Sequence, residues 1–211
     1  MKNKTDRTIE TYNMTALSYE RNGIGLSTEE ELGKFKALLR SNARILDAGC
    51  GFGRELLYFT KHGFDTYGID ASEELLKLAR KRAPKANIQL VDLRSKLPFG
   101  NNFFDGIWAR NSLHHLESKD LKNALSEIRR ILKPNGIFLS EWKEGQGEII
   151  AKEEFVENKE RFFNLKMSKE IFKLTEEAGF EVIEDYIYNW SERYGGKRDY
   201  SNFAVIIAKK N

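Results

Sequence analysis

The chain has 211 residues, of which 40% are hydrophobic, so it can bury a substantial core as a single domain. Its 35 Lys and Arg residues nearly balance 32 Asp and Glu, and the formal net charge of +3 directs it neither to nucleic acid nor to anionic membranes. It has no bilayer-length apolar run, and its first residues lack the hydrophobic core of a signal peptide. Cys50 is the only cysteine, which excludes an internal disulfide and a cysteine-rich zinc site. We expect a cytoplasmic protein that needs no metal.

Residues 1–40 contain two predicted helices. Apolar spacing over 5–21 is typical of an amphipathic helix, and a glycine-containing loop at 22–25 separates it from a second helix over 29–39. We expect this segment to form a lid over a ligand site. Tyr12 and Tyr19 are candidate substrate contacts, although aromatic residues on such a face are more often core. The apolar residues of the first helix are Ile9, Tyr12, Ala16, Leu17 and Tyr19.

A glycine-rich loop follows the first predicted strand. The apolar run from Ile45 ends at Asp47 and opens into glycines at 49, 51 and 53, before a helix over 55–61. Glycines let the backbone turn tightly and approach a ligand, although such a loop alone is often only a turn. The dinucleotide fingerprint would need its third glycine at Arg54, and no P-loop string occurs. The loop therefore favours a different nucleotide-like ligand.

Three acidic residues recur at the ends of predicted strands. Asp47 closes the first strand, Asp70 closes a strand over 64–70, and Asp92 follows a strand over 87–91. The interval of roughly 22 residues is one strand–helix–strand unit, which places the three carboxylates at one edge of a parallel sheet. Ligands bind at that edge.

Two more strands are predicted after Asp92. Residues 106–109 form a short apolar run, and Pro134 and Gly136 end a helix before the strand-like residues 136–142. Residues 110–115 follow the first of these strands directly. We therefore expect them on the same sheet edge as the three acids.

The C-terminal third departs from this alternation. Residues 143–148 are a predicted loop, and a helix over 153–163 would carry Phe162 and Phe163 into a second wall of the pocket. A helix over 168–178 ends at Gly179, and residues 180–188 and 203–208 form a closing antiparallel hairpin. The connection within this hairpin mixes aromatic and basic residues, which can contact single-stranded nucleic acid but more often form a solvated loop. These residues are Trp190, Arg193, Tyr194, Lys197 and Arg198.

Together these motifs resemble the class I S-adenosylmethionine-dependent methyltransferases. The glycine loop resembles motif I of that family, and residues 132–136 resemble the helix stop before its fifth strand. The resemblance covers 45–139 and implies a three-layer α/β Rossmann-like sandwich with a seven-stranded, mostly parallel sheet. The implied strand order is 3-2-1-4-5-7-6, with the last strand antiparallel. One domain over 1–211 would then comprise the lid, a core at 43–142, an insertion at 143–167, and a helix and hairpin at 168–211.

The resemblance implies S-adenosyl-L-methionine as cofactor and S-adenosyl-L-homocysteine as product. Asp47 and the glycine loop would hold the methionine end, Asp70 both ribose hydroxyls, and Asp92 with Leu93 the adenine. A carboxylate suits a vicinal diol because it accepts two donors at once. The expected cofactor-binding residues are Asp47, Ala48, Gly49, Cys50, Gly51, Gly53, Asp70, Ala71, Asp92, Leu93, Ala109 and Arg110.

The resemblance also places the acceptor beside residues 110–115. Transfer from a sulfonium is an in-line displacement that depends on alignment and exclusion of water, but a hydroxyl or carbon acid usually also needs a general base. His114 and His115 are the candidate bases. Neighbours on a helix point about a hundred degrees apart, so at most one should face the pocket. The expected substrate contacts are Tyr12, Tyr19, Asn111, Trp142, Phe162 and Phe163.

The acceptor class is narrowed by a missing motif. Enzymes that methylate base or glutamine nitrogens often carry Asp/Asn-Pro-Pro-Tyr/Phe after the fourth strand, where this chain has Ala109-Arg110-Asn111-Ser112. We expect a small-molecule acceptor, no membrane partner, and a monomer or homodimer. Three alternatives remain open: a tRNA methyltransferase of the wobble-uridine type, a non-catalytic S-adenosylmethionine-binding protein, and a nicotinamide enzyme lacking the third glycine.

Overall fold

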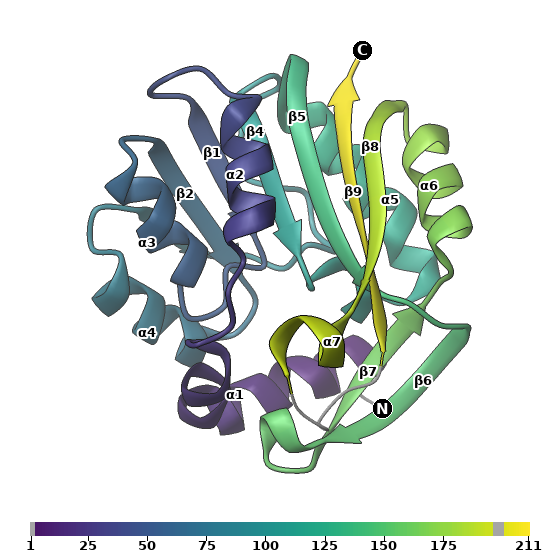
Figure 1. Cartoon of the computed structure of the whole chain (residues 1–211). Helices are drawn as coiled ribbons and strands as arrows, with labels where there is room; N and C mark the ends of the chain where they lie inside the picture. Colours follow the sequence, from purple (N-terminus) through teal and green to yellow (C-terminus); the bar gives the residue numbers. More distant parts are fainter. Residues whose placement is uncertain (1–2, 196–200) are drawn as a thin grey trace.

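The computed structural model describes residues 3–195 and 201–211, which form a seven-stranded sheet and a separate two-stranded hairpin (Figure 1). The order in the large sheet is β3-β2-β1-β4-β5-β9-β8. β9 is antiparallel to both of its neighbours, and the other pairs are parallel. The predicted Rossmann-like order and antiparallel last strand are confirmed. The strands are β1 (Arg44–Ala48), β2 (Asp65–Asp70), β3 (Asn87–Leu90), β4 (Phe104–Arg110), β5 (Leu132–Lys143), β8 (Phe180–Asn189) and β9 (Asn202–Lys210).

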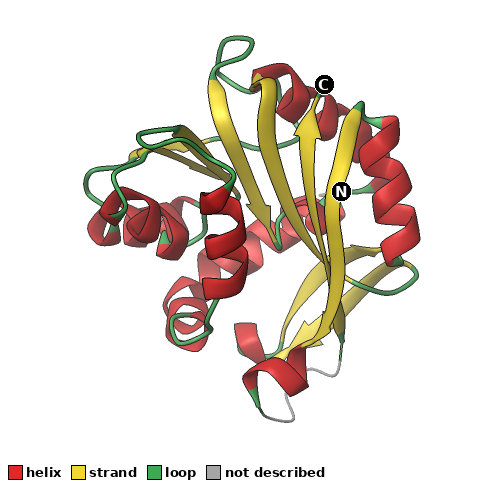
Figure 2. Ribbon diagram, turned by 45° about the horizontal axis from the view of Figure 1, so that its top comes forward, coloured by secondary structure: helices red, strands yellow, loops and turns green. Residues whose placement is uncertain are grey.

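Helices cover both faces of the sheet (Figure 2). Successive strand residues point to opposite faces, so Ile45 packs in one hydrophobic cluster and Leu46 in another. The first cluster includes residues of α2 (Glu29–Ala37) and α3 (Arg54–Lys61), and the second includes residues of α5 (Ser118–Ile131) and α6 (Ser168–Glu177). α4 (Glu73–Arg82) packs beside α3. The two clusters bury both faces of the sheet, and Asp47 and Asp70 lie at the carboxyl ends of β1 and β2.

α1 (Lys4–Gly23) buries threonines, and the apolar face predicted for it is only partly correct. Thr8 Oγ1 accepts from the N–H of Phe162 at 2.8 Å, and Thr11 Oγ1 donates to the carbonyl of Glu160 at 2.7 Å. Leu17 is 71% exposed. The helix faces the open edge of the strand that contains Glu160 and Phe162. Backbone groups at such an edge need hydrogen-bonding partners, which hydroxyls supply and aliphatic side chains do not. The helix has a kink at Thr15.

The insertion is a β-hairpin, so the helix predicted over 153–163 is wrong. β6 (Gly147–Glu153), the 3-10 turn η2 (Glu154–Val156) and β7 (Lys159–Leu165) form an antiparallel pair. Glu157 and Asn158 have φ of 55° and 57°, which reverses the chain. Pairing with β6 on one edge and with α1 on the other outweighs the local helix preference of this Glu- and Lys-rich segment. Figure 1 shows α1 and the hairpin together at one end of the large sheet.

The C-terminal part follows the prediction except in the segment that connects the two strands of the closing hairpin. α6 ends before Gly179, which has φ 87°, and β8 and β9 form the closing hairpin. Residues Trp190–Tyr194 form a short helix, α7, in place of a loop. Arg193 pairs with Glu31 at 2.6 Å and lies 4.3 Å from the ring centre of Tyr188. Lys197 and Arg198 lie outside the described residues.

β5 begins at Leu132 and not at Gly136, and its pairing with β4 shifts register between Phe104–Leu132 and Gly106–Ile137, where Asn135 has φ 62°. Among residues 3–195 and 201–211, no helix is both long enough and apolar enough to cross a membrane.

The substitution Gly53→Ala should lower the free energy of unfolding by about 1–3 kcal/mol. Gly53 has φ 81°, and a Cβ there would lie 2.9 Å from the Cα of Ala79. Gly25→Ala is the matched control, because nothing lies within 4 Å of its added Cβ. Urea unfolding followed by circular dichroism measures both. Equal midpoints for Gly53→Ala and the unsubstituted protein would contradict this packing.

Candidate functional site

The glycine loop after β1 is held against the ends of β2 and β4. The N–H groups of Gly49 and Cys50 donate to the carbonyl of Ile69 at 2.8 and 2.9 Å. Gly49 has φ 91°, and a Cβ there would lie 2.3 Å from the Cβ of Ser112. The backbone can approach the end of β4 this closely only because the position is glycine.

Asp70, at the end of β2, is a largely buried carboxylate that fixes the loop. Its Oδ2 accepts from the N–H of Gly51 at 2.9 Å, and its Oδ1 accepts from the N–H of Ser72 at 2.8 Å. Burial raises the pKa of Asp70, and the two donors oppose that effect. Each oxygen keeps a further lone pair, so the carboxylate can still accept from a pair of hydroxyls.

Asp47, near the end of β1, has an unsatisfied oxygen. Its side chain is buried, and Oδ2 has no hydrogen-bond partner among the described residues. Burial raises the pKa of Asp47 well above its usual range, and Glu55 and Asp70 add to the effect. A positively charged donor beside Asp47 would relieve this penalty, because a buried charge is costly unless it is paired.

Asp92 follows β3 and is paired with Arg94. Both carboxylate oxygens lie 3.0 Å from the Nε of Arg94, and Arg94 also contacts Asp6 of α1 at 2.7 Å. Partial burial disfavours the charged form, but Arg94 outweighs it and lowers the pKa of Asp92. The pair therefore joins the sheet edge to the N-terminal helix.

Two narrow cavities, the loop cavities, adjoin the glycine loop. One is bordered by Asp70 and Asp92 and the other by Asp47. The structure therefore brings most of the expected cofactor residues together: Asp47, Gly49, Cys50, Gly51, Asp70, Ala71, Asp92, Leu93 and Arg110. Ala48 and Ala109 instead lie in the core, and Gly53 packs against Ala79. Burial raises the pKa of the Cys50 thiol, which agrees with a packing role.

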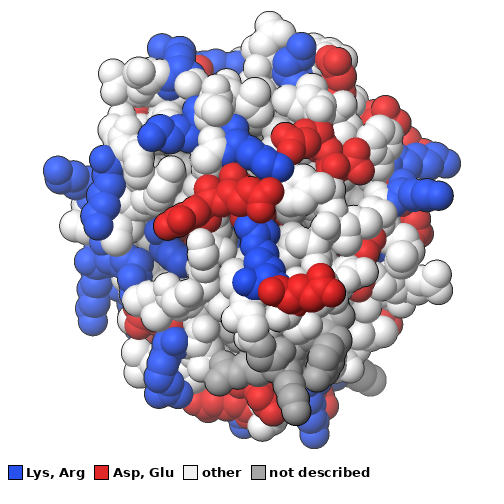
Figure 3. Space-filling model, viewed as in Figure 1, with Lys and Arg blue, Asp and Glu red and all other residues white. Residues whose placement is uncertain are grey.

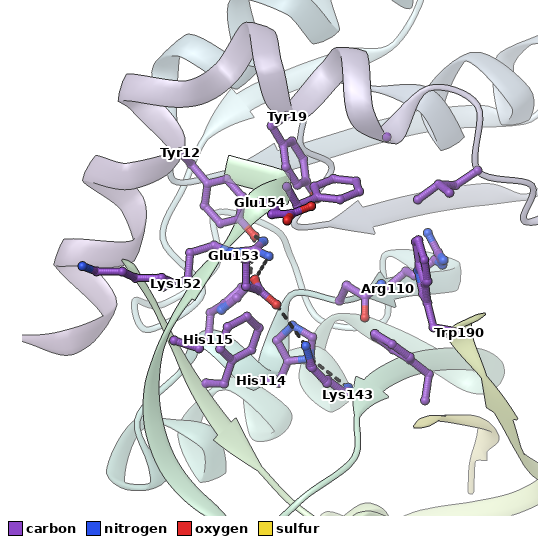
Figure 4. Close-up of a pocket in the computed structure, with 18 of the residues that line it drawn as sticks. Tyr12, Tyr19, Arg110, His114, His115, Lys143, Lys152, Glu153, Glu154 and Trp190 are labelled. Atoms are coloured by element: carbon purple, nitrogen blue, oxygen red, sulfur yellow. Dashed lines mark hydrogen bonds and ion pairs between the residues drawn. The ribbon is translucent and has the colours of Figure 1, made fainter. Parts of the chain in front are cut away.

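A third cavity, the large cavity, has a volume of about 520 Å³ and lies between α1, the end of β5 and the β6–β7 hairpin. Arg110 and Asn111 line it and both loop cavities, so the three spaces meet at the end of β4. Figure 4 shows Tyr12 and Tyr19 across this space from His114 and Lys143.

The buried carboxylate of Glu141 holds Arg110 and Asn111, which both line all three cavities. Glu141 accepts from Arg110 Nε at 2.9 Å and from the side-chain amide of Asn111 at 2.7 Å. Asn111 itself has φ 53°, and its Oδ1 is buried without a partner among the residues described. Because Glu141 accepts from the amide nitrogen, the orientation of the Asn111 amide is determined, and Oδ1 remains an acceptor at the junction of the cavities.

Both histidines border the large cavity, so the expectation that at most one would face it is wrong. They lie in a 3-10 turn, η1 (Leu113–His115), with ring centres 4.5 Å apart. His115 Nδ1 lies 2.7 Å from the carbonyl of Phe162, which can only accept, so Nδ1 donates. Its Nε2 then accepts from the Tyr12 hydroxyl at 2.9 Å, which in turn accepts from Arg161 at 2.6 Å.

Neither ring is placed as a strong base. Burial, with Arg161 adding to it, lowers the pKa of His115 to about 3. Burial and the neighbouring His115 lower the pKa of His114 well below its ordinary value. His114 Nδ1 accepts from the backbone N–H of Lys143 at 3.1 Å, so the neutral ring carries its proton on Nε2.

The predicted substrate contacts divide between the cavity and the core. Tyr12, Tyr19, Asn111 and Phe163 line the large cavity. Trp142 is 1% exposed, packs in the core and donates to Ser140 Oγ at 3.0 Å. The predicted contact of Trp142 with substrate is therefore wrong. Phe162 is also buried away from the cavity lining, because neighbouring strand residues point to opposite sides.

Lys143, Glu153 and Arg161 line the large cavity and were not among the site residues expected from the sequence. Glu153 pairs with Lys143 at 2.9 Å and also contacts Arg161. Arg161 and Phe163 are two residues apart and share a strand face, but polar and apolar residues do not alternate over 159–165, so the local sequence contains no signal for a strand.

Comparison with known proteins agrees with this geometry. Residues 46–140 match the methyltransferase domain family. An uncharacterized methyltransferase of Synechocystis sp. is 30% identical over 152 residues, covering 69% of this chain and 70% of that protein. Other curated relatives are longer, and the chain spans about 40% of their length.

Two solved structures share the fold. A 1,6-didemethyltoxoflavin-N1-methyltransferase of Burkholderia thailandensis, with 1,6-didemethyltoxoflavin and S-adenosylhomocysteine bound, is 19% identical with a TM-score of 0.68 over 98% of this chain and 87% of that chain. The [4+2]-cyclase SpnF is 18% identical with a TM-score of 0.74 over 99% and 97%.

The substitution Asp70→Asn should weaken binding of S-adenosylhomocysteine by more than about 1 kcal/mol, or about fivefold, because a charge-assisted hydrogen bond contributes at least this much. Asp65→Asn is the control, since Asp65 is on the same strand but pairs with Arg44 at 2.8 Å. Calorimetry with both variants measures the effect. Unchanged affinity in Asp70→Asn would remove Asp70 from the binding site.

The protein should lose stability as the pH falls from about 6.5 to about 5, by roughly 2 kcal/mol from His115, and His114 should change stability in the same direction. The folded-state pKa of each lies below the ordinary value of 6.5, so the unfolded chain takes up protons first. His115→Gln should flatten the slope of unfolding free energy against pH, and His62→Gln, at an exposed position, should not. The slope is compared with that of the unsubstituted protein because Asp47 shifts in the opposite direction. An unchanged slope in His115→Gln would contradict the neutral, buried state.

Proposed function

Because the chain belongs to the class I S-adenosylmethionine-dependent methyltransferase family, we propose that it transfers a methyl group to a small-molecule acceptor in the large cavity. One observation carries the proposal. The loop cavities and the large cavity meet at Arg110 and Asn111, so a cofactor at the glycine loop and an acceptor against the hairpin would be neighbours.

The residues at the loop cavities fit the cofactor. Asp47 Oδ2, which has no partner in the described part of the chain, suits the ammonium of the cofactor's methionine portion, and Asp70 has acceptor capacity left for the ribose hydroxyls. Asp92 and Leu93 border the same cavity and would contact the adenine.

Bound S-adenosylmethionine supplies an electrophilic methyl group on its sulfonium. The chain itself aligns the acceptor and excludes water. Tyr12 and Tyr19 close the cavity from α1, and Phe163 closes it from the hairpin. His115 uses both ring nitrogens in bonds to protein groups, so its role is to position Tyr12 and Arg161.

A small acceptor is favoured over RNA. The large cavity is walled by two segments that hydrogen-bond to each other, α1 and β7, which leaves the site recessed. On the face in Figure 3, basic and acidic residues are interspersed, whereas RNA binding usually requires a basic surface. Arg193, one of the basic residues considered for nucleic acid, is paired with Glu31.

Calorimetry should show binding of S-adenosylmethionine and S-adenosylhomocysteine, with NADH as the control ligand. Incubation with pooled metabolites should then release S-adenosylhomocysteine, measured by mass spectrometry, and the Asp70→Asn variant should release much less. Release with RNA pools alone would assign an RNA acceptor. Binding without release from any pool would identify a non-catalytic binder, or a cofactor use such as that of a cyclase, and would refute the proposed transfer.

A further inference from the structure

The two edges of the β6–β7 hairpin differ in how they are covered. The outer edge of β7 faces α1, whose threonine hydroxyls bond to the carbonyl of Glu160 and the N–H of Phe162. Within residues 3–195 and 201–211, β6 pairs only with β7, and no other strand or side chain there bonds to its outer edge. Figure 1 shows β6 as the outermost strand of the hairpin. β6 therefore has an open edge.

The hydrogen bonds of β7 identify which residues of β6 point outward. In an antiparallel pair, the N–H and C=O of one residue point to the same side, and those of the next residue point to the other side. Since Glu160 and Phe162 point to α1, the odd-numbered residues of β7 point to β6. The register of the hairpin then directs the odd-numbered residues of β6 to β7 and leaves Glu148, Ile150 and Lys152 pointing outward.

The edges of the large sheet are protected, whereas the edge of β6 is not. β3 has only four residues, and β8 carries the acids Glu181, Glu184 and Asp185 and an irregular register with β9. Short strands, charges and bulges are the usual devices that prevent pairing with another chain. β6 has seven residues in unbroken register with β7, and its central residues Ile149 and Ile150 are 40% and 46% exposed.

The sequence of β6 is complementary to itself in the antiparallel direction. Residues 147–153 read Gly-Glu-Ile-Ile-Ala-Lys-Glu. When two copies overlap along the whole strand, Ile150 lies opposite Ile150 of the second copy, and Glu148 lies opposite Lys152. The outward residues then face one another, so they can exchange backbone hydrogen bonds while opposite charges meet. Glu148 Oε2 accepts from Lys4 at 2.8 Å and keeps a second lone pair, and Lys152 is exposed.

We propose that two copies of this chain pair through β6 about a two-fold axis at Ile150. The product is a four-stranded sheet in the order β7-β6-β6-β7, with an α1 helix covering each outer edge. A second copy is the occupant that fits, because β6 itself supplies an antiparallel strand with opposite charges in register. Ala151 and Glu153 of β6 line the large cavity, so this interface would fix one wall of the acceptor site in each copy.

Sedimentation equilibrium of the full chain, from about 1 to about 500 µM, tests the association. A dimer should form with a dissociation constant between about 1 and 100 µM, because one strand pair makes an interface at the small end of the usual range. A monomer at every concentration, or assembly beyond a dimer, would overturn the proposal.

Ile150→Pro tests the edge of β6 directly. It removes an N–H that points outward and leaves the bonds to β7 in place, and proline is tolerated at such edge positions. The dissociation constant should rise at least about tenfold. Ile150→Ala, which keeps the N–H, is the matched control and should weaken the dimer less than proline does. Circular dichroism confirms folding of both variants. An equally stable dimer in Ile150→Pro would overturn the proposal.

New cysteines test the register without destabilising the strand. Ile150→Cys should form a disulfide-linked dimer on oxidation, because Cα atoms of a hydrogen-bonded pair lie about 5.5 Å apart. Ile149→Cys is the matched control, since the pairing sets Ile149 opposite Ala151 and holds the two new cysteines beyond disulfide reach. Native Cys50 is buried and is common to both variants. A non-reducing gel measures the linkage. Linkage at position 149 equal to that at 150 would overturn the proposal.

A charge reversal tests why a second copy is preferred. Lys152→Glu sets a glutamate opposite Glu148 at both ends of the strand pair and should raise the dissociation constant at least about fivefold. Lys159→Glu, at an exposed position on β7 and away from the paired edge, is the matched control and should leave it unchanged. Sedimentation equilibrium measures both variants. An unchanged dissociation constant in Lys152→Glu would contradict the proposed pairing.

Discussion

Three neighbouring parallel strands in this protein end in or near a carboxylate, and a low-dielectric sheet edge tolerates such charges only when each finds a donor. Asp70 finds two backbone N–H groups, one of them from the glycine loop. Asp92 finds Arg94. Asp47 keeps one oxygen without a partner among the described residues. Of the three carboxylates, Asp47 is therefore the one that most strongly favours a cationic ligand group beside it.

The site is completed by segments that are distant in sequence and that hold one another in place. Threonine hydroxyls of α1 satisfy the open edge of β7, and Arg161 on that strand donates to Tyr12 on α1. Tyr12 in turn donates to His115, whose other nitrogen donates back to β7. This closed set of hydrogen bonds keeps His115 neutral and links the wall of the large cavity to the end of β4. It leaves His115 a structural role, whereas His114 keeps a donor available to the cavity.

The fold alone does not decide the reaction. A [4+2]-cyclase and a methyltransferase with bound S-adenosylhomocysteine share this architecture at similar TM-scores and similarly low identity. What differs among proteins of one fold is the chemistry of the cavity beside the cofactor. Here that cavity combines aromatic walls with hydrogen-bond donors and with the charged side chains of Lys143, Glu153 and Arg161, and these features bear on the acceptor more directly than the sheet does.

The sequence by itself determined the sheet and the cofactor side of the site. Strand and helix periodicity, the glycine spacing and the recurring acids are local patterns, and strand–helix–strand units place Asp47, Asp70 and Asp92 at one edge of a parallel sheet. The strand order was predicted from the resemblance to the family. Only the tertiary structure decided the acceptor side. Residues 153–163 favour a helix locally, but residues 159–163 belong to β7 because β6 and α1 supply partners for both edges of that strand. Arg161 therefore reaches the cavity, while Trp142 and Phe162 turn into the core. Pairing over long separations in the chain sets which side of a strand faces the ligand, and no local pattern records it.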